Sequence, residues 1–173
     1  QMVTQRRSSA GTQEAIRRLH EGQIGNVHLA RCYYNSLRGP IGRGQQVQPP
    51  EELNYELWQG PAPHVPYRSN VVHYNWHWFW HWGTGETLNN ATHEVDLCMW
   101  ALDVKFPNRI SADGGRYHFE DDWEFYDTLN TSYEYDGKMI TWEGKSCNNV
   151  PYYDRGRGAL INGTEGSVLI DRG

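Results

Sequence analysis

Residues 73–102 read HYNWHWFWHWGTGETLNNATHEVDLCMWAL, a tryptophan- and histidine-rich segment that passes through a glycine turn into a patterned stretch. Its aromatic density and the stop at residues 83–85 favour an extended conformation for the first part. A strand would place alternate residues on opposite faces, with Trp76, Trp78, Trp80 and Trp82 on one and His77, Phe79 and His81 on the other. These rings predict buried packing, a pocket wall or a platform on which a sugar ring stacks.

A metal site is the weaker interpretation of the same residues. A helix would stack His73, His77 and His81 one turn apart, and two such imidazoles can bind one zinc ion. The segment has no glutamate of the HExxH kind, and a spacing match alone has a high false-positive rate. We therefore expect no metal.

After the glycine turn, the pattern predicts a helix over residues 86–102 with two stripes at helical spacing. The stripe expected to face the core is apolar and comprises Leu88, Thr92, Val95, Met99 and Leu102. The second stripe points to another side and comprises Asn89, His93, Asp96 and Trp100.

His93 on the second stripe is a candidate general acid/base, because an imidazole with a pKa near neutrality exchanges protons with a substrate hydroxyl. Asn89 and Asp96 are placed to orient or polarise it. The alternative is a helix histidine that packs against Trp100, and the residues alone favour neither. Nucleophilic catalysis has little support, since no serine stands in a GxSxG context.

The remaining sequence predicts one more helix and several strands. The helix has Thr12 as its N-cap and ends at Gly22 and Gly25. The β-prone segments are residues 2–5, 27–35, 109–112, 116–119, 127–135, 138–142 and 167–170, with a hairpin turn at 136–137. Residues 36–70 form a long functional loop or covering arm, anchored by Leu57 and Trp58. This order favours an α+β fold, an open, largely antiparallel sheet with helices packed on one face.

Composition excludes several classes of protein. A formal net charge of −5 over 173 residues argues against a nucleic-acid partner, which requires a basic face. No apolar run approaches the roughly 20 residues of a membrane span. The 3 cysteines lie far apart and predict reduced, mostly buried thiols rather than a disulfide framework. The chain begins with Gln1 and stops directly after the apolar run at 167–170, which favours a fragment of a longer protein.

Six segments together resemble the C-terminal domain of the Gfo/Idh/MocA oxidoreductase family, in the bacterial branch with a tryptophan-rich NWHWFWHWGTGE segment. They are QRRSS at 5–9, LHEGQIGNVHLAR at 19–31, LWQGPAP at 57–63, WHWGTGE at 80–86, NNATHEVDL at 89–97 and GTEGSVLID at 163–171. The resemblance covers nearly the whole chain, and its specificity comes from the order and spacing of the segments.

The resemblance implies a two-domain dehydrogenase of which this chain is one part. In that family a Rossmann domain binds NAD(P), and an α+β domain follows it. Residues 1–10 then correspond to an exit strand and linker, and 11–173 to a C-terminally truncated substrate-binding and oligomerisation domain. The implied substrate is a sugar, inositol or related polyol. NAD(P) would bind the full-length protein and not this chain, which alone would be inactive, and the open sheet face would form a homo-oligomer.

The resemblance also implies roles for individual residues. The family's acid/base helix carries an Asp and, four residues later, a His, and these positions are Asn89 and His93 here. An asparagine can hydrogen-bond a hydroxyl but cannot transfer a proton. The implied substrate-binding residues are Arg6, His77, Trp80, His81 and Asp96. Two alternatives stay open: an NAD-dependent glycoside hydrolase of the same fold, and a non-catalytic sugar-binding or assembly module.

Overall fold

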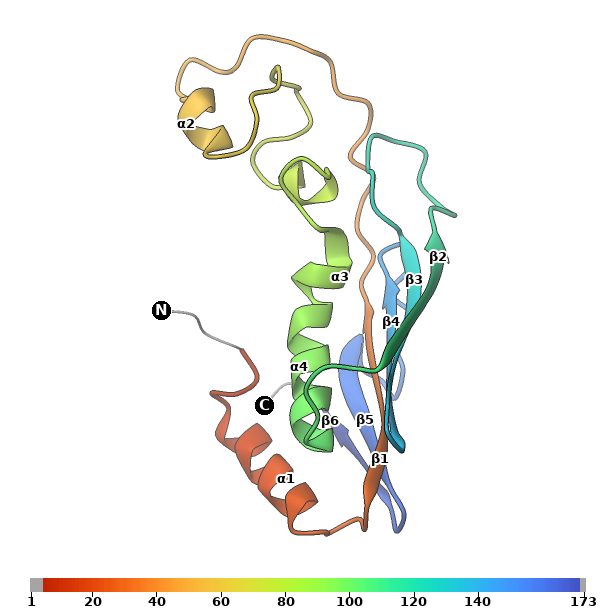
Figure 1. Cartoon of the computed structure of the whole chain (residues 1–173). Coiled ribbons are helices and arrows are strands. Elements are labelled where there is room, and N and C mark those ends of the chain that lie inside the picture. The colour runs from red at the N-terminus through yellow and green to blue at the C-terminus, as the bar shows by residue number, and fades with distance from the viewer. Residues whose placement is uncertain (1–4, 172–173) are drawn as a thin grey trace.

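Six strands form one open sheet in the order β2-β3-β4-β1-β5-β6 (Figure 1). The computed structural model describes residues 5–171, so the predicted strand over 2–5 lies outside them except for Gln5, which is in a turn. The strands are β1 (Val27–Asn35), β2 (Arg109–Gly115), β3 (Thr128–Tyr135), β4 (Lys138–Lys145), β5 (Arg157–Gly163) and β6 (Ser167–Ile170). Only the β1–β4 pairing among them is parallel, which confirms the predicted largely antiparallel sheet.

Helices cover one face of this sheet. They are α1 (Ala10–His20), α2 (Tyr55–Gln59), the 3-10 helix η1 (Asn75–Trp78), α3 (Gly85–Asn89) and α4 (Ala91–Leu102). In Figure 1, α4 runs along the sheet, α1 lies near its carboxyl end, and the segment with α2 extends beyond the sheet. The opposite face carries no helix from residues 5–171, so the predicted α+β architecture is confirmed. No helix in this range is long and apolar enough to cross a membrane.

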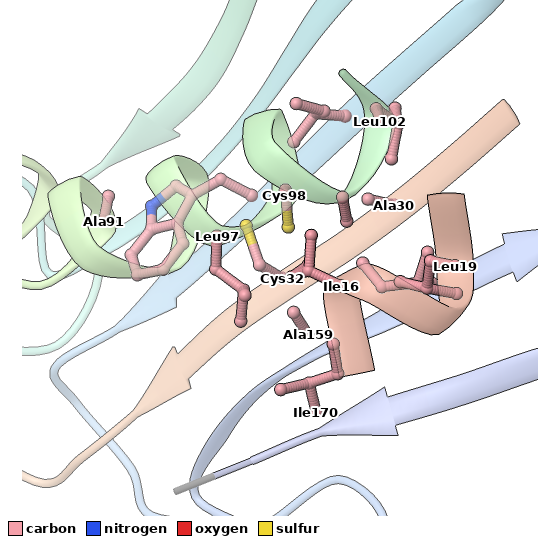
Figure 2. Packing of buried hydrophobic residues seen from close by; sticks show 14 residues of the cluster. Ile16, Leu19, Ala30, Cys32, Ala91, Leu97, Cys98, Leu102, Ala159 and Ile170 are labelled. Atoms are coloured by element: carbon pink, nitrogen blue, oxygen red, sulfur yellow. The ribbon is translucent and has the colours of Figure 1, made fainter. Parts of the chain in front are cut away.

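The core lies between α4, α1 and the central strands. Alternate residues of β1 face the helices, and Ala30 and Cys32 pair in register with Ile140 and Trp142 of β4. Figure 2 shows Leu97 and Cys98 of α4 in the packed layer over β1. All of these side chains are almost fully buried, and all three cysteines are free thiols, as predicted.

The predicted apolar stripe of the 86–102 helix is wrong in its first half, where Leu88 and Thr92 are exposed, whereas Val95, Met99 and Leu102 lie in or against the core. Asn90 interrupts the helix between α3 and α4, and Leu88 is 59% exposed. The buried residues of α4 are Ala91, Glu94, Leu97, Cys98, Ala101 and Leu102. A pattern based on apolar residues places Glu94 outside, whereas ion pairs with two arginines hold it inside. Of the predicted second stripe, Asn89 and His93 lie off the core, whereas Trp100 packs against it.

The tryptophan-rich segment is not a strand. It forms η1 followed by turns, and Gly83 returns so close to His77 that a Cβ at residue 83 would clash with the His77 backbone. The predicted alternation is therefore lost. Trp78 is 1% exposed and stacks on Trp123 with ring centroids 3.7 Å apart, whereas Trp80 on the same predicted face is 63% exposed.

Two local predictions near the chain's first half are corrected by side-chain contacts. Ser9, not Thr12, caps α1, because the Ser9 hydroxyl accepts the backbone N–H of Thr12. The loop over 36–70 is anchored by Trp58, whose ring packs edge-on against Trp82 with centroids 5.2 Å apart, and not by Leu57, which is 77% exposed.

Two strand predictions in the second half also fail. Residues 116–119 form a loop, because the buried Asp127 carboxylate accepts the backbone N–H groups of residues 117–119 that a ladder would use. Strand β5 was not predicted, since its sequence RGALING contains two glycines and an asparagine, which are depleted in strands. It nevertheless pairs with β1 and β6 inside the sheet.

Candidate functional site

The break between α3 and α4 places two candidate residues beside one another. Asn89 ends α3, and His93 lies in the first turn of α4. Asn89 is exposed and His93 is half-buried. Both lie on the side of the helix pair that the hydrophobic core does not use. The predicted pair is therefore available to a ligand.

A buried carboxylate lies beneath Asn89. Glu86, in the first turn of α3, is almost fully buried and accepts hydrogen bonds from the side-chain amides of Asn89 and Asn90. Arg38 donates to it as well, with Nε 3.2 Å from Oε2. Burial raises the pKa of Glu86, and the charge of Arg38 opposes that shift.

A second carboxylate binds two arginines under the first turn of α4. Glu94 is fully buried and accepts from Arg6 Nη2 at 2.8 and 3.0 Å and from Arg157 Nε at 2.7 Å. Arg6 also donates to the Asp171 carbonyl. Arg6 was predicted to face substrate or cofactor, and the structure places it in this ion-paired group directly behind His93. Its part in binding a ligand stays a prediction.

The environment of His93 favours the uncharged form of its imidazole. Burial lowers the pKa of His93, and the positive charge of Arg157 lowers it further. Its Nδ1 is buried and has no hydrogen-bond partner within residues 5–171. A neutral imidazole can accept a proton.

His77 lies on the other side of Arg38 from Glu86. Burial lowers the pKa of His77, and Arg38 contributes in the same direction. Its ring packs edge-on against Tyr74, whose hydroxyl accepts from Arg38 Nη1 at 3.0 Å. His77 Nε2 is buried without a partner in the part of the chain that the structure describes. Arg38 thus links His77 to Glu86.

The other three predicted site residues lie apart from this group. Trp80 packs on Phe125 in the wall of an apolar cavity of about 390 Å³ between α3 and the β2–β3 edge. His81 hydrogen-bonds the Pro63 carbonyl, and Asp96 pairs with Arg7 further along α4. Within residues 5–171 no hydrogen bond or ring contact joins them to Asn89 or His93, although the Asp96 charge opposes the lowering of the His93 pKa; their roles stay predictions.

Arg157, Arg38, Glu86, Glu94 and Tyr34 were not predicted from the sequence. The ring of Tyr34 lies beside both arginines, with the guanidinium carbon of Arg157 5.2 Å and that of Arg38 5.7 Å from its centroid. A cavity of about 290 Å³ opens beside Tyr34 and Arg157 at the carboxyl end of β1. No local signal in the sequence distinguishes Glu86 and Glu94 from ordinary polar residues of a surface helix. Within residues 5–171, no cluster of three or more His, Cys, Asp or Glu could hold a metal ion.

Comparison with known proteins gives the class and then the family. Residues 41–169 match the model described as "Oxidoreductase family, C-terminal alpha/beta domain". The chain therefore has the C-terminal α/β domain of an oxidoreductase. It belongs to the Gfo/Idh/MocA family, which confirms the resemblance inferred from the sequence. A search among curated proteins found no match.

Solved structures with the same fold are longer than this chain. The WlbA dehydrogenase from Bordetella pertussis, in complex with NADH and UDP-GlcNAcA, is 19% identical, with a TM-score of 0.60 over 96% of this chain and 41% of that one. The aldose-aldose oxidoreductase from Caulobacter crescentus, complexed with glycerol, is 14% identical, with a TM-score of 0.63 over 97% and 39%. The chain spans about two fifths of these neighbours' length. At these identities the likeness shows the fold alone.

Proposed function

We propose that the chain is the substrate-binding domain of an NAD(P)-dependent oxidoreductase that acts on a sugar, inositol or related polyol. The observation that carries the proposal is the half-buried His93, whose pKa is lowered by burial, four residues from Asn89 on the open side of the helix pair. The family supplies the reaction class. Neighbours solved with a nucleotide sugar and with glycerol support the substrate class.

In this proposal, His93 accepts the proton of a substrate carbinol as its carbon is oxidised. Asn89 hydrogen-bonds the substrate and orients it. The Glu94 ion pairs position Arg157, whose charge keeps His93 neutral and ready to accept a proton. His77, on the other side of Arg38 from Glu86, is proposed to contact the same substrate.

We propose that NAD(P) is held by a dinucleotide-binding domain outside this chain. Residues 5–171 contain no repeated parallel βαβ units, because only β1 and β4 pair in parallel. NAD(P) bound there would supply the hydride acceptor for oxidation of the carbinol carbon. The chain by itself is therefore proposed to be inactive, and turnover by the isolated 173-residue chain would contradict this.

The test uses the chain joined to its dinucleotide-binding domain. A panel of sugars, inositols and their derivatives is screened for NAD(P)-linked change in absorbance. His93→Gln, which removes the titratable group, should lower kcat by about 10²–10⁴-fold. Cleavage of a glycoside without net NADH would favour the hydrolase alternative. Ligand binding with no effect of His93→Gln would favour a non-catalytic module.

We propose that the open face of the sheet forms a homo-oligomer. Leu160 and Leu169, paired across β5 and β6, lie on the face opposite the helices and are only half-buried. Leu160→Glu should shift sedimentation toward the monomer at fixed concentration, because a charge would enter the interface. An oligomeric state unchanged by this substitution would contradict the proposal.

A further inference from the structure

The side-chain amide of Asn89 has a fixed orientation. Its Nδ2 lies 3.3 Å from Glu86 Oε1 and donates to that oxygen. No donor within residues 5–171 reaches its Oδ1, and the side chain is exposed. Asn89 therefore offers a free acceptor oxygen on the side that a ligand would approach.

Glu86 fixes this orientation because an ionised carboxylate can only accept hydrogen bonds. Turning the Asn89 amide over would place its Oδ1 against the Glu86 oxygens. The carboxylate itself cannot move freely, since Arg38 holds it, and Arg38 is held in turn by the hydroxyls of Tyr34 and Tyr74 at 3.1 and 3.0 Å.

A substrate hydroxyl has one proton to donate. If His93 accepts the proton of the reacting hydroxyl, Asn89 Oδ1 must accept its hydrogen bond from a different group. Asn89 and His93 are four residues apart, and both lie on the side of the helix pair that the core does not use, so both can reach neighbouring substituents of one ligand.

We propose that Glu86 is a positioning residue that makes Asn89 a hydrogen-bond acceptor for a hydroxyl on the carbon next to the reacting one. The site then selects vicinal diols. This inference rests on the proposed function of the chain. It also accounts for asparagine at residue 89, because an aspartate there would place a second carboxylate against Glu86.

The test compares four proteins, each joined to the dinucleotide-binding domain: wild type, Glu86→Gln, Asn89→Asp and the double variant. The measurement is the ratio of kcat/KM for a vicinal diol to that for its analogue without the second hydroxyl. The two substrates differ by one hydrogen bond to Asn89, so the wild-type kcat/KM for the diol should be about fivefold higher or more. Each single variant should reduce that ratio toward one. Glutamine can donate to aspartate, so the double variant should restore at least half of the wild-type selectivity.

Failure of the inference is distinct from failure of the proposed function. Turnover of any polyol supports the function, and a ratio unchanged in Glu86→Gln, or a double variant worse than both single ones, overturns the inference.

A second readout uses the 173-residue chain and needs no turnover. The Asn89 side-chain amide resonances should shift as Glu86 titrates, and Glu86→Gln should abolish the shift. The amide of Asn130, exposed on β3, is the control. An Asn89 amide that does not respond to Glu86 overturns the inference.

Discussion

Replacement of Glu94 by glutamine should destabilise the protein more than any other single charge removal near the site. Glu94 is 0% exposed and is the shared partner of Arg6 and Arg157. Glutamine keeps the volume but leaves two guanidinium groups beside a neutral amide. Removing one partner of a buried ion pair costs about 3–5 kcal/mol. For a domain of this size each kcal/mol lowers Tm by roughly 2–4 °C, so a fall of about 6–20 °C is expected.

Glu14→Gln is a matched control for this experiment. Glu14 on α1 also pairs with two arginines, Arg17 and Arg18, but these groups lie on the surface. Water screens such exposed pairs, and no measurable change in Tm is expected. Both variants are followed by thermal and urea unfolding. A fall in Tm for Glu94→Gln no larger than that for the control would refute the reasoning that burial makes this ion pair essential.

Three further outcomes are expected. Burial lowers the pKa of His93 in the folded protein, so the unfolded chain binds a proton first as the pH falls. The free energy of unfolding should therefore decline from pH 7 to 5. His93→Gln should reduce that decline, as measured by urea midpoints across this pH range. Gly83→Ala should cost about 1–3 kcal/mol through its backbone clash, whereas Gly39→Ala, with nothing within 4 Å, should stay within about 0.5 kcal/mol in the same unfolding assay. Burial raises the pKa of the Cys32 thiol, so maleimide should label Cys147 first in the native protein and all 3 cysteines after unfolding, as counted by mass spectrometry.

The elements in which apolar and polar residues repeat with a clear period were predictable from the sequence. β1 and β6 have the predicted bounds, and β3 and β4 differ from them only at their ends. The 86–102 helix exists, although Asn90 divides it. Asn89 and His93 were found because helical spacing alone brings them to one side.

The rest of the site depends on contacts that no local pattern encodes. Arg157 reaches Glu94 across 63 positions of the chain, and Arg38 reaches Glu86 across 48. A buried glutamate looks like a surface residue until its distant partners are known. The tryptophan segment failed for a related reason, because the close return of Gly83 to His77 replaces the sheet pairing that alternation presumes.

The place of β1 in the centre of the sheet governs the order in which the molecule can assemble. Leu29 pairs with Met139 on one side and with Asn162 on the other, so both neighbours of this strand come more than a hundred residues later. Contacts so distant in sequence slow folding, because a long loop must close before they form. During synthesis β1 has no strand to pair with until β4 and β5 have left the ribosome. The protein should therefore refold slowly and depend on chaperones that shield an unpaired strand.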